Sequence, residues 1–164
     1  DAVRHADAAA LEAALRPGGL ARVKARRIQK LLGALADRGG LTLDSLRPLS
    51  VEEAEAELLR FDGVGLKTAR CVLLFALGKA AFPIDTHIER VLKRMGVLPE
   101  GVSTEQAHRL ATDAVPEGRH LSLHLNLIAH GRQVCHARRP DCPRCGLRDL
   151  CCFYARTQGS ERPS

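Results

Sequence analysis

The amino-acid sequence predicts an all-α protein. Hydrophobic residues make up 45% of the 164 residues, which is enough to build a packed core. Aromatic residues make up only 3% and Trp is absent, so Leu, Ala, Val and Ile must fill that core, as in packed helices rather than a β-sandwich. Apolar residues recur at helical spacing through most of the chain, and neither a strand pair nor an internal repeat is visible.

The first predicted helices are separated by glycine-rich breaks. A helix is expected over residues 6–15, and the sequence Pro-Gly-Gly at 17–19 stops it. A second helix is expected over residues 22–35, before the Gly-Gly pair at 39–40. Its polar face is basic, which we interpret as a solvated surface. The basic residues of that face are Arg22, Lys24, Arg26, Arg27 and Lys30.

The next two helices flank a glycine-rich turn. Ser50 starts a helix, with Glu53 three residues later completing a capping box, and this helix runs to about Arg60. Residues 61–65, Phe-Asp-Gly-Val-Gly, are too rich in glycine to stay helical, and the helical pattern resumes over residues 66–77.

A short loop over residues 78–83 separates these elements from the C-terminal half. Asp85 or Thr86 can cap the following helix, whose apolar positions keep a 3.6-residue period. Further helices are expected over residues 103–114 and 121–130. The segment after them is rich in Cys, Arg and Pro and cannot form a packed core unaided.

The charge and the cysteines limit the classes of function. The formal net charge of +6 and the pI near 9.3 suit a polyanionic partner, although an ordinary basic protein fits them equally well. No apolar run reaches the length of a membrane span and no signal-peptide pattern opens the chain, so we expect an intracellular, cytoplasmic protein. Five of the six cysteines fall within residues 135–152 and only Cys71 lies apart, which indicates a metal site rather than a disulfide framework.

The turn Gly63-Val64-Gly65 between two helices can bind a phosphate. Two glycines one residue apart permit a tight turn with positive φ, and backbone N–H groups there can point outward at a phosphate oxygen. Such a turn grips a nucleic-acid backbone without reading its sequence. A plain turn between two antiparallel helices is the alternative.

Lys67 follows this turn, and Asp85 comes 18 residues later. Positive surroundings and partial burial would favour the neutral, nucleophilic amine of Lys67. Asp85 precedes a helix and follows an apolar segment. By spacing alone the alternative stays open that Lys67 is a surface cation and Asp85 only a helix cap. We interpret His87 as a helix-start residue with a structural hydrogen bond rather than a proton carrier.

The clustered cysteines have the spacing C-x6-C-x2-C-x5-C. Four thiolates can hold either Zn²⁺ or an iron–sulfur cluster, and the spacing alone leaves zinc open. Cys152 is a fifth cysteine, and the spacing assigns Cys151 rather than Cys152 to the site. The four assigned residues are Cys135, Cys142, Cys145 and Cys151.

The stretch Leu58–Arg90, LLRFDGVGLKTARCVLLFALGKAAFPIDTHIER, resembles the core of the endonuclease III branch of the helix–hairpin–helix–GPD DNA glycosylases. The Gly-Val-Gly turn, the Lys-Thr-Ala that follows it and the Asp-Thr-His are all at the family's spacing. One departure is Asp62, where the family usually has Pro. The resemblance extends from about Leu20 to Tyr154, and its cysteine spacing is similar to that of the family's [4Fe–4S] loop.

The resemblance implies a helix–hairpin–helix DNA glycosylase fold with a C-terminal iron–sulfur loop, and it implies site residues. Lys67 matches the nucleophile that attacks the sugar C1′ and forms a Schiff base, and Asp85 matches the essential carboxylate. The four cysteines would hold a [4Fe–4S] cluster. The expected DNA-binding residues are the hairpin and three arginines of the cysteine loop: Gly63, Val64, Gly65, Arg138, Arg139 and Arg144.

The implied activity is base excision DNA repair. The expected substrate is double-stranded DNA with oxidised pyrimidines or abasic sites, and the expected enzyme is a monomer that removes the base and cleaves the strand by β-elimination. It would act in the cytoplasm, at the nucleoid. Two alternatives stay open: a monofunctional adenine or mismatch glycosylase, which generally lacks a lysine at this position, and a non-catalytic DNA-binding protein.

The resemblance also suggests a domain division. We expect a helical domain with the hairpin over residues 1–82, a helical cluster domain over 83–156 with its loop at 135–151, and a polar tail over 157–164. We further expect that helices of the family's N-terminal region are missing before Asp1.

Overall fold

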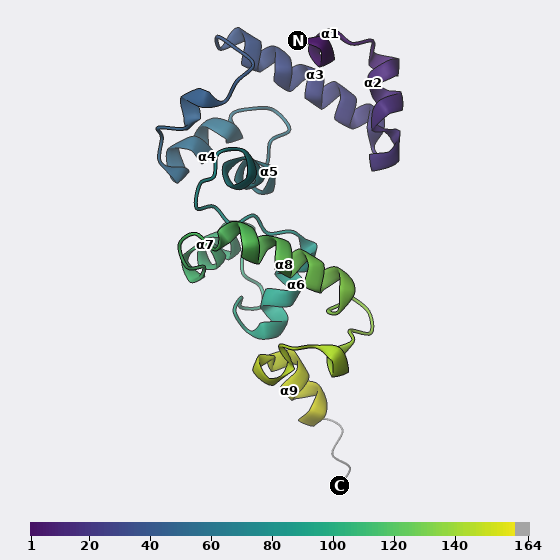
Figure 1. Ribbon diagram of the computed structural model, residues 1–164, viewed down its shortest axis with the longest axis vertical. Coiled ribbons are helices and arrows are strands. Elements are labelled where there is room, and N and C mark those ends of the chain that lie inside the picture. Colours follow the sequence, from purple (N-terminus) through teal and green to yellow (C-terminus); the bar gives the residue numbers. More distant parts are fainter. Residues whose placement is uncertain (160–164) are drawn as a thin grey trace. The chain divides into compact units, whose positions relative to one another are not determined.

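A computed structural model describes residues 1–159, and within them every regular element is helical (Figure 1). The chain divides into two compact units: an N-terminal unit of residues 1–65 and a C-terminal unit from residue 66 onward. The domain bounds expected from the sequence, 1–82 and 83–156, divide the chain elsewhere and stay a prediction. Part of the expected polar tail, residues 160–164, lies outside the described residues.

The N-terminal unit begins with two short helices packed on a long one. Helices α1 (Ala2–His5) and α2 (Ala8–Leu15) both contact α3 (Ala21–Asp37). Asp7 caps α2 by accepting a hydrogen bond from the Ala10 N–H at 2.9 Å. The predicted Pro-Gly-Gly break takes the form of a 3₁₀ turn, η1 (Arg16–Gly18).

The second half of this unit contains the 3₁₀ turn η2 (Asp44–Leu46) and helix α4 (Val51–Leu59). The predicted capping box is present. The Ser50 hydroxyl accepts from the Glu53 N–H at 3.1 Å, and the Glu53 carboxylate accepts from the Ser50 N–H at 2.8 Å. The buried apolar residues of the N-terminal unit are Ala25, Leu46, Ala54, Leu58 and Phe61.

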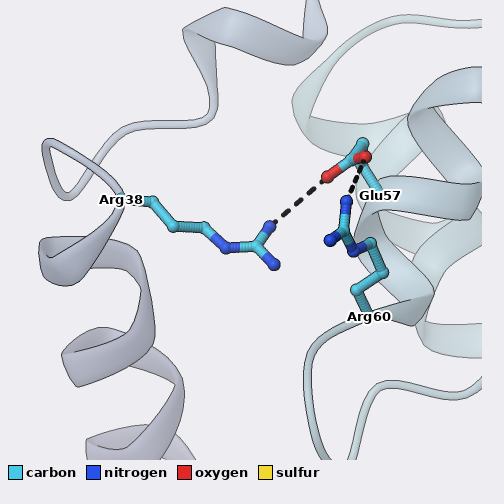
Figure 2. Close-up of polar contacts among 3 residues, drawn as sticks. All are labelled: Arg38, Glu57 and Arg60. Carbon is cyan, nitrogen blue, oxygen red and sulfur yellow. Dashed lines mark hydrogen bonds and ion pairs between the residues drawn. The ribbon is translucent and has the colours of Figure 1, made fainter.

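Polar contacts fix the end of α3 to α4. Figure 2 shows the Glu57 carboxylate between two arginines: Arg38 donates to it at 3.4 Å and Arg60 at 2.9 Å. The Arg38 guanidinium also lies 4.5 Å from the centre of the Phe61 ring, within the range of a cation–π contact. Because Arg38 directly follows α3, these contacts hold that helix against the element that leads into the hairpin.

The C-terminal unit starts with helix α5 (Leu66–Cys71), which widens into a π-helical turn, η3 (Val72–Ala76). The sequence predicts one continuous α-helix here, because a π turn carries no clear compositional signal. The buried Arg70 side chain donates to the carbonyl oxygen of His108 at 3.0 Å, and this bond anchors α5 to helix α7 (Thr104–Ala114).

Three further helices complete the C-terminal unit. Helix α6 (Thr86–Met95) packs against α8 (His120–Gln133) and α9 (Cys152–Gly159). A capping box between Ser103 and Gln106 starts α7. One apolar cluster joins these elements. Its buried members are Phe82, Ile84, Ile88, Val91, Leu92, Leu98, Ala107, Ala111, Val115 and Leu127.

The cysteine-rich segment between α8 and α9 has little regular structure. It contains two 3₁₀ turns, η4 (Cys142–Arg144) and η5 (Arg148–Leu150), and is otherwise loop. None of the helices in residues 1–159 combines the length and apolar character needed to cross a membrane.

Candidate functional site

Asp85 lies at the start of α6 and is held there by the backbone. Its Oδ1 accepts hydrogen bonds from the N–H groups of His87 at 2.9 Å and Ile88 at 2.8 Å. Within residues 1–159, its Oδ2 has no hydrogen-bond partner. One oxygen therefore orients this half-buried carboxylate, and the other stays available.

Lys67 is the second residue of α5, and its side chain is exposed. In the part of the chain that the structure describes, the amine makes no hydrogen bond and no ion pair. This exposure agrees with a surface position, and the partial burial that would favour a neutral amine is not present here. The amine is therefore free to reach toward a ligand.

His124 on α8 is a buried residue that the sequence analysis did not select. It is 2% exposed, and its Nδ1 lies 3.0 Å from the Pro83 carbonyl oxygen, which can only accept, so Nδ1 carries the hydrogen. The Phe75 and Phe82 rings meet the imidazole edge to face, with centroids 5.3 and 5.9 Å away. A histidine at a core-facing helical position gives no sequence signal that sets it apart.

The electrostatic surroundings of His124 connect Lys67 with Asp85. Burial is the main cause that lowers the pKa of His124 below 6.5. The Lys67 amine lowers this pKa as well, whereas the Asp85 carboxylate raises it. Both charges therefore act on the same imidazole, so Lys67 and Asp85 lie within electrostatic range of His124.

Arg90 joins the start of α6 to the cysteine segment. Its guanidinium donates to the carbonyl oxygens of Cys135 at 2.9 Å, Gly131 at 2.8 Å and Thr86 at 3.2 Å. It also lies 3.1 Å from Nδ1 of His87. The His87 ring is therefore engaged in a structural contact, as the sequence analysis interpreted it.

Four cysteines line one cavity in the C-terminal unit. They are the four that the spacing selects, Cys135, Cys142, Cys145 and Cys151. Burial raises the pKa of the Cys142 thiol, and the other three cysteines raise it further. The cysteines thus act on one another electrostatically, and a cationic centre between them would favour their thiolate forms.

Polar groups surround the sulfur atoms. Nη1 of Arg94 donates to Sγ of Cys135 at 3.2 Å, and the Cys151 thiol donates to the Arg94 carbonyl oxygen at 3.5 Å. Nε2 of His130 lies 3.7 Å from Sγ of Cys145. Helices α6 and α8 therefore supply polar contacts to the cysteine loop from two sides.

Four cysteine thiolates around one cavity are a donor set that a metal ion or an iron–sulfur cluster can use, and the two differ in the spacing they need. A zinc ion bound by four thiolates at 2.3 Å would need sulfur atoms about 3.8 Å apart. No group of three or more His, Cys, Asp or Glu side chains within residues 1–159 is arranged to hold one metal ion. A [4Fe–4S] cluster binds its cysteines through separate irons, so it needs their sulfurs farther apart than a single ion does.

Cys152 has a different place from the other four. Its side chain is exposed, its thiol donates to the Met95 carbonyl oxygen at 3.4 Å, and it does not line the cavity. Gly96, which ends α6 with φ +80°, leaves the space for it: a Cβ at residue 96 would lie 2.8 Å from the Cys152 sulfur. The assignment of Cys151 rather than Cys152 therefore has geometric support.

The arginines expected to contact DNA are exposed, whereas one N–H group of the hairpin is already used within the turn. Arg138, Arg139 and Arg144 are exposed, and Arg144 pairs with Asp141 at 3.2 Å. In the hairpin, the Val64 N–H donates to the Phe61 carbonyl oxygen at 3.1 Å. The turn therefore does not direct all three of its N–H groups outward.

The sequence comparisons agree with this architecture. Residues 1–117 match the HhH-GPD superfamily of base excision DNA repair proteins, and the chain belongs to this family. Within the family it is of the endonuclease III type. Endonuclease III of Sulfolobus acidocaldarius is 35% identical over 154 residues, which cover 94% of this chain and 67% of that protein.

Two further comparisons extend the likeness. An Arabidopsis thaliana protein, whose name assigns it provisionally to the DNA glycosylases, is 36% identical over 92% of this chain. The chain spans only 56% of that protein's length. A solved structure of an endonuclease III–DNA covalent intermediate is similar with a TM-score of 0.77 and 33% identity, over 95% of this chain and 70% of that one. The predicted all-α helix–hairpin–helix fold is confirmed.

Proposed function

We propose that this chain is a bifunctional DNA glycosylase and abasic-site lyase. The observation that carries the proposal is that an uncommitted amine, Lys67, and an oriented carboxylate, Asp85, both lie within electrostatic range of His124. Its substrate is double-stranded DNA with oxidised pyrimidines or abasic sites. It acts as a monomer, in the cytoplasm at the nucleoid.

The side chains suit the chemistry. The Lys67 amine attacks C1′ of the damaged nucleoside, the bond from C1′ to the base breaks, and the base leaves with the bonding electron pair and takes up a proton. Positive charge develops on the sugar during this step, and the free Oδ2 of Asp85 stabilises it. For C1′ to be reached, the nucleotide must leave the base stack.

The lyase step follows from the covalent link. Loss of the Lys67 proton and opening of the sugar ring give a Schiff base, which acidifies the C2′ proton. Removal of that proton expels the 3′ phosphate by β-elimination, and water then hydrolyses the Schiff base to free Lys67. The strand is thus cut without hydrolysis of its phosphodiester bond.

DNA is held by its backbone. The hairpin residues Gly63, Val64 and Gly65 approach one phosphate, and Arg138, Arg139 and Arg144 of the cysteine loop contact others. Three exposed guanidinium groups on one loop suit such contacts better than sequence readout.

Cys135, Cys142, Cys145 and Cys151 would hold a [4Fe–4S] cluster. The cluster supplies four strong cross-links within the loop when it is bound, so its role is structural. Arg94 and His130 contact the sulfur atoms and keep the loop on α6 and α8.

Borohydride trapping tests the proposed nucleophile. The chain should form a covalent complex with abasic-site DNA in the presence of borohydride, and Lys67→Ala should abolish it. Lys93→Ala, which removes another lysine of the same unit, is the matched control and should trap normally. Trapping by Lys67→Ala at the normal level would reject the assignment.

A panel of defined lesions separates the proposal from its alternatives. A monofunctional enzyme releases the base without cutting the strand, and a non-catalytic protein binds DNA without any reaction. The bifunctional enzyme should release oxidised pyrimidines and nick the strand in the same reaction.

Metal analysis tests the cluster. Protein purified without oxygen should contain iron and sulfide and be yellow-brown. Cys135→Ser should lower the iron content and the stability of the C-terminal unit, whereas Cys152→Ser should retain the iron. Stoichiometric zinc without iron, in protein produced with ample iron, would contradict the assignment.

A further inference from the structure

Part of the basic face of α3 reaches the hairpin turn. A Cβ placed on Gly63 would lie 3.2 Å from Cδ and 3.4 Å from Nε of Arg27, so the arginine side chain packs directly against the turn. Gly63 also has φ +80°, a conformation that favours glycine. The basic face of α3 was expected to be a solvated surface, but Arg27 has a defined place beside the proposed phosphate-binding turn.

Asp62 draws a second cation to the same turn. Nζ of Lys30, one helical turn along α3 from Arg27, lies 2.5 Å from Oδ2 of Asp62, and both side chains are largely exposed. The hydrogen bond from Lys30 holds the pKa of this carboxyl below its ordinary value, and Arg27 and the Gly63 N–H lower it further. The carboxylate is therefore ionised and surrounded by donors.

We propose that Arg27 and Lys30 form a phosphate-binding site beside the hairpin, and that the Asp62 carboxylate occupies this site until a DNA phosphodiester displaces it. The inference deepens the proposed function, on which it rests. Carboxylate and phosphodiester oxygens both accept hydrogen bonds from lysine and arginine, so one can replace the other at the same donors.

The exchange is easy because the existing pair is weak. An ion pair between two exposed side chains contributes little to stability, and salt screens it further. Each phosphate neutralised by a cation releases counterions from the DNA, which drives the replacement. After the exchange Asp62 lies beside a phosphate of like charge, so it continues to weaken the complex.

This interpretation makes Asp62 a residue that limits DNA affinity. At this position the family usually has Pro, which carries no charge. A lysine at the position of Lys30 would then have no carboxylate partner at the turn. This chain would therefore bind DNA more weakly and release it faster than a variant without the carboxylate.

A second exposed ion pair provides a matched control. Asp44 pairs with Arg47 at 2.9 Å, and the two side chains are exposed to a similar degree, 69% and 58%. This pair is local, between residues three apart along the chain. Asp44→Asn therefore makes the same change in net charge as Asp62→Asn without freeing a cation at the hairpin.

The experiment measures the affinity of the full chain for a short, undamaged DNA duplex by fluorescence anisotropy at several NaCl concentrations. Asp62→Asn should bind about two- to fivefold more tightly than the unchanged chain, and Asp62→Ser should behave alike. Asp44→Asn should stay near the affinity of the unchanged chain. Adding Lys30→Gln to Asp62→Asn should remove the gain and lower the slope of log K against log [NaCl] by about one.

Several outcomes separate the inference from the proposed function. The inference would be overturned if Asp62→Asn and Asp44→Asn bound DNA with equal affinity. It would also be overturned if neither Lys30→Gln nor Arg27→Gln changed the salt slope. Borohydride trapping would stay intact in both cases. Failure of trapping together with the expected affinity changes would reject the lyase and support the phosphate site. A chain that does not bind the duplex at all would overturn both.

Discussion

Arg90 on α6 donates a hydrogen bond from Nε to the carbonyl oxygen of Cys135, 45 residues later, at 2.9 Å. The same guanidinium holds the carbonyl oxygens of Gly131 and Thr86. The helix that Asp85 caps is thereby joined to the first cysteine of the loop, so the geometry around Asp85 depends on the position of that loop.

Loss of Arg90 should destabilise the C-terminal unit. Arg90→Gln leaves partly buried carbonyl groups without their donor, which should lower the free energy of unfolding by about 2–4 kcal/mol. Arg109→Gln, at an exposed position of α7, should change it by less than about 0.5 kcal/mol. Urea unfolding followed by circular dichroism measures both, and equal effects would contradict a structural role for Arg90.

Gly131 should not tolerate even a methyl group. A Cβ there would lie 2.8 Å from Cβ of His87, an atom fixed by its own backbone. Gly131→Ala should therefore lower stability by about 1–3 kcal/mol, despite the higher helix propensity of alanine. Gly33→Ala in α3 is the matched control, because nothing lies within 4 Å of its Cβ position, and it should raise stability by up to about 1 kcal/mol. Thermal unfolding of the two variants measures both changes in stability. A Gly131→Ala variant more stable than the unchanged chain would show that α6 and α8 can move apart.

The charge and the capping role of Asp85 can be separated. Asparagine keeps an oxygen for the His87 and Ile88 N–H groups, so Asp85→Asn should leave stability nearly unchanged while reducing turnover by more than about tenfold, or ~1.4 kcal/mol. Asp85→Ala should lose the turnover and a further 0.5–2 kcal/mol or so of stability. Turnover of Asp85→Asn close to that of the unchanged chain would reject the electrostatic role.

The buried imidazole of His124 should make stability depend on pH. Because burial lowers its pKa below 6.5, the unfolded chain binds a proton more readily than the folded chain. Stability should therefore fall as the pH decreases below about 6.5. His124→Gln, which can still donate to the Pro83 carbonyl but does not titrate, should show a smaller loss between about pH 7.5 and about pH 5.5. His5→Gln, at an exposed position of α1, is the control and should lose as much stability on acidification as the unchanged chain. If His124→Gln also loses that much, groups other than His124 cause the pH dependence.

Local signals in the sequence predicted much of the fold. The Ser50–Glu53 capping box, the Gly63 turn and the Asp85 cap each depend on residues a few positions apart, and all three are present. The π-helical turn at 72–76 was missed because the apolar pattern of a π turn resembles that of an α-helix.

Contacts between distant segments could not be predicted. Two of the partners of Arg90 are the backbone carbonyl groups of Cys135 and Gly131, more than 40 residues away, and carbonyl groups carry no sequence signal. His124 enters the candidate site only through the packing of α8 on the loop at Pro83. The exposure of Lys67 could not be predicted either, because nothing in its local pattern states which face of α5 is covered.

The double use of Asp85 has an evolutionary consequence. A side-chain oxygen at residue 85 stabilises the start of α6 whether or not the chain is catalytic. A descendant that had lost all catalysis would therefore still be selected to retain Asp or Asn at this position. Lys67 makes no such structural contact within the described residues, and nothing in the fold would preserve it once the reaction was lost. Among descendants of this chain, the identity of residue 67 would therefore distinguish active enzymes from inactive copies better than that of residue 85.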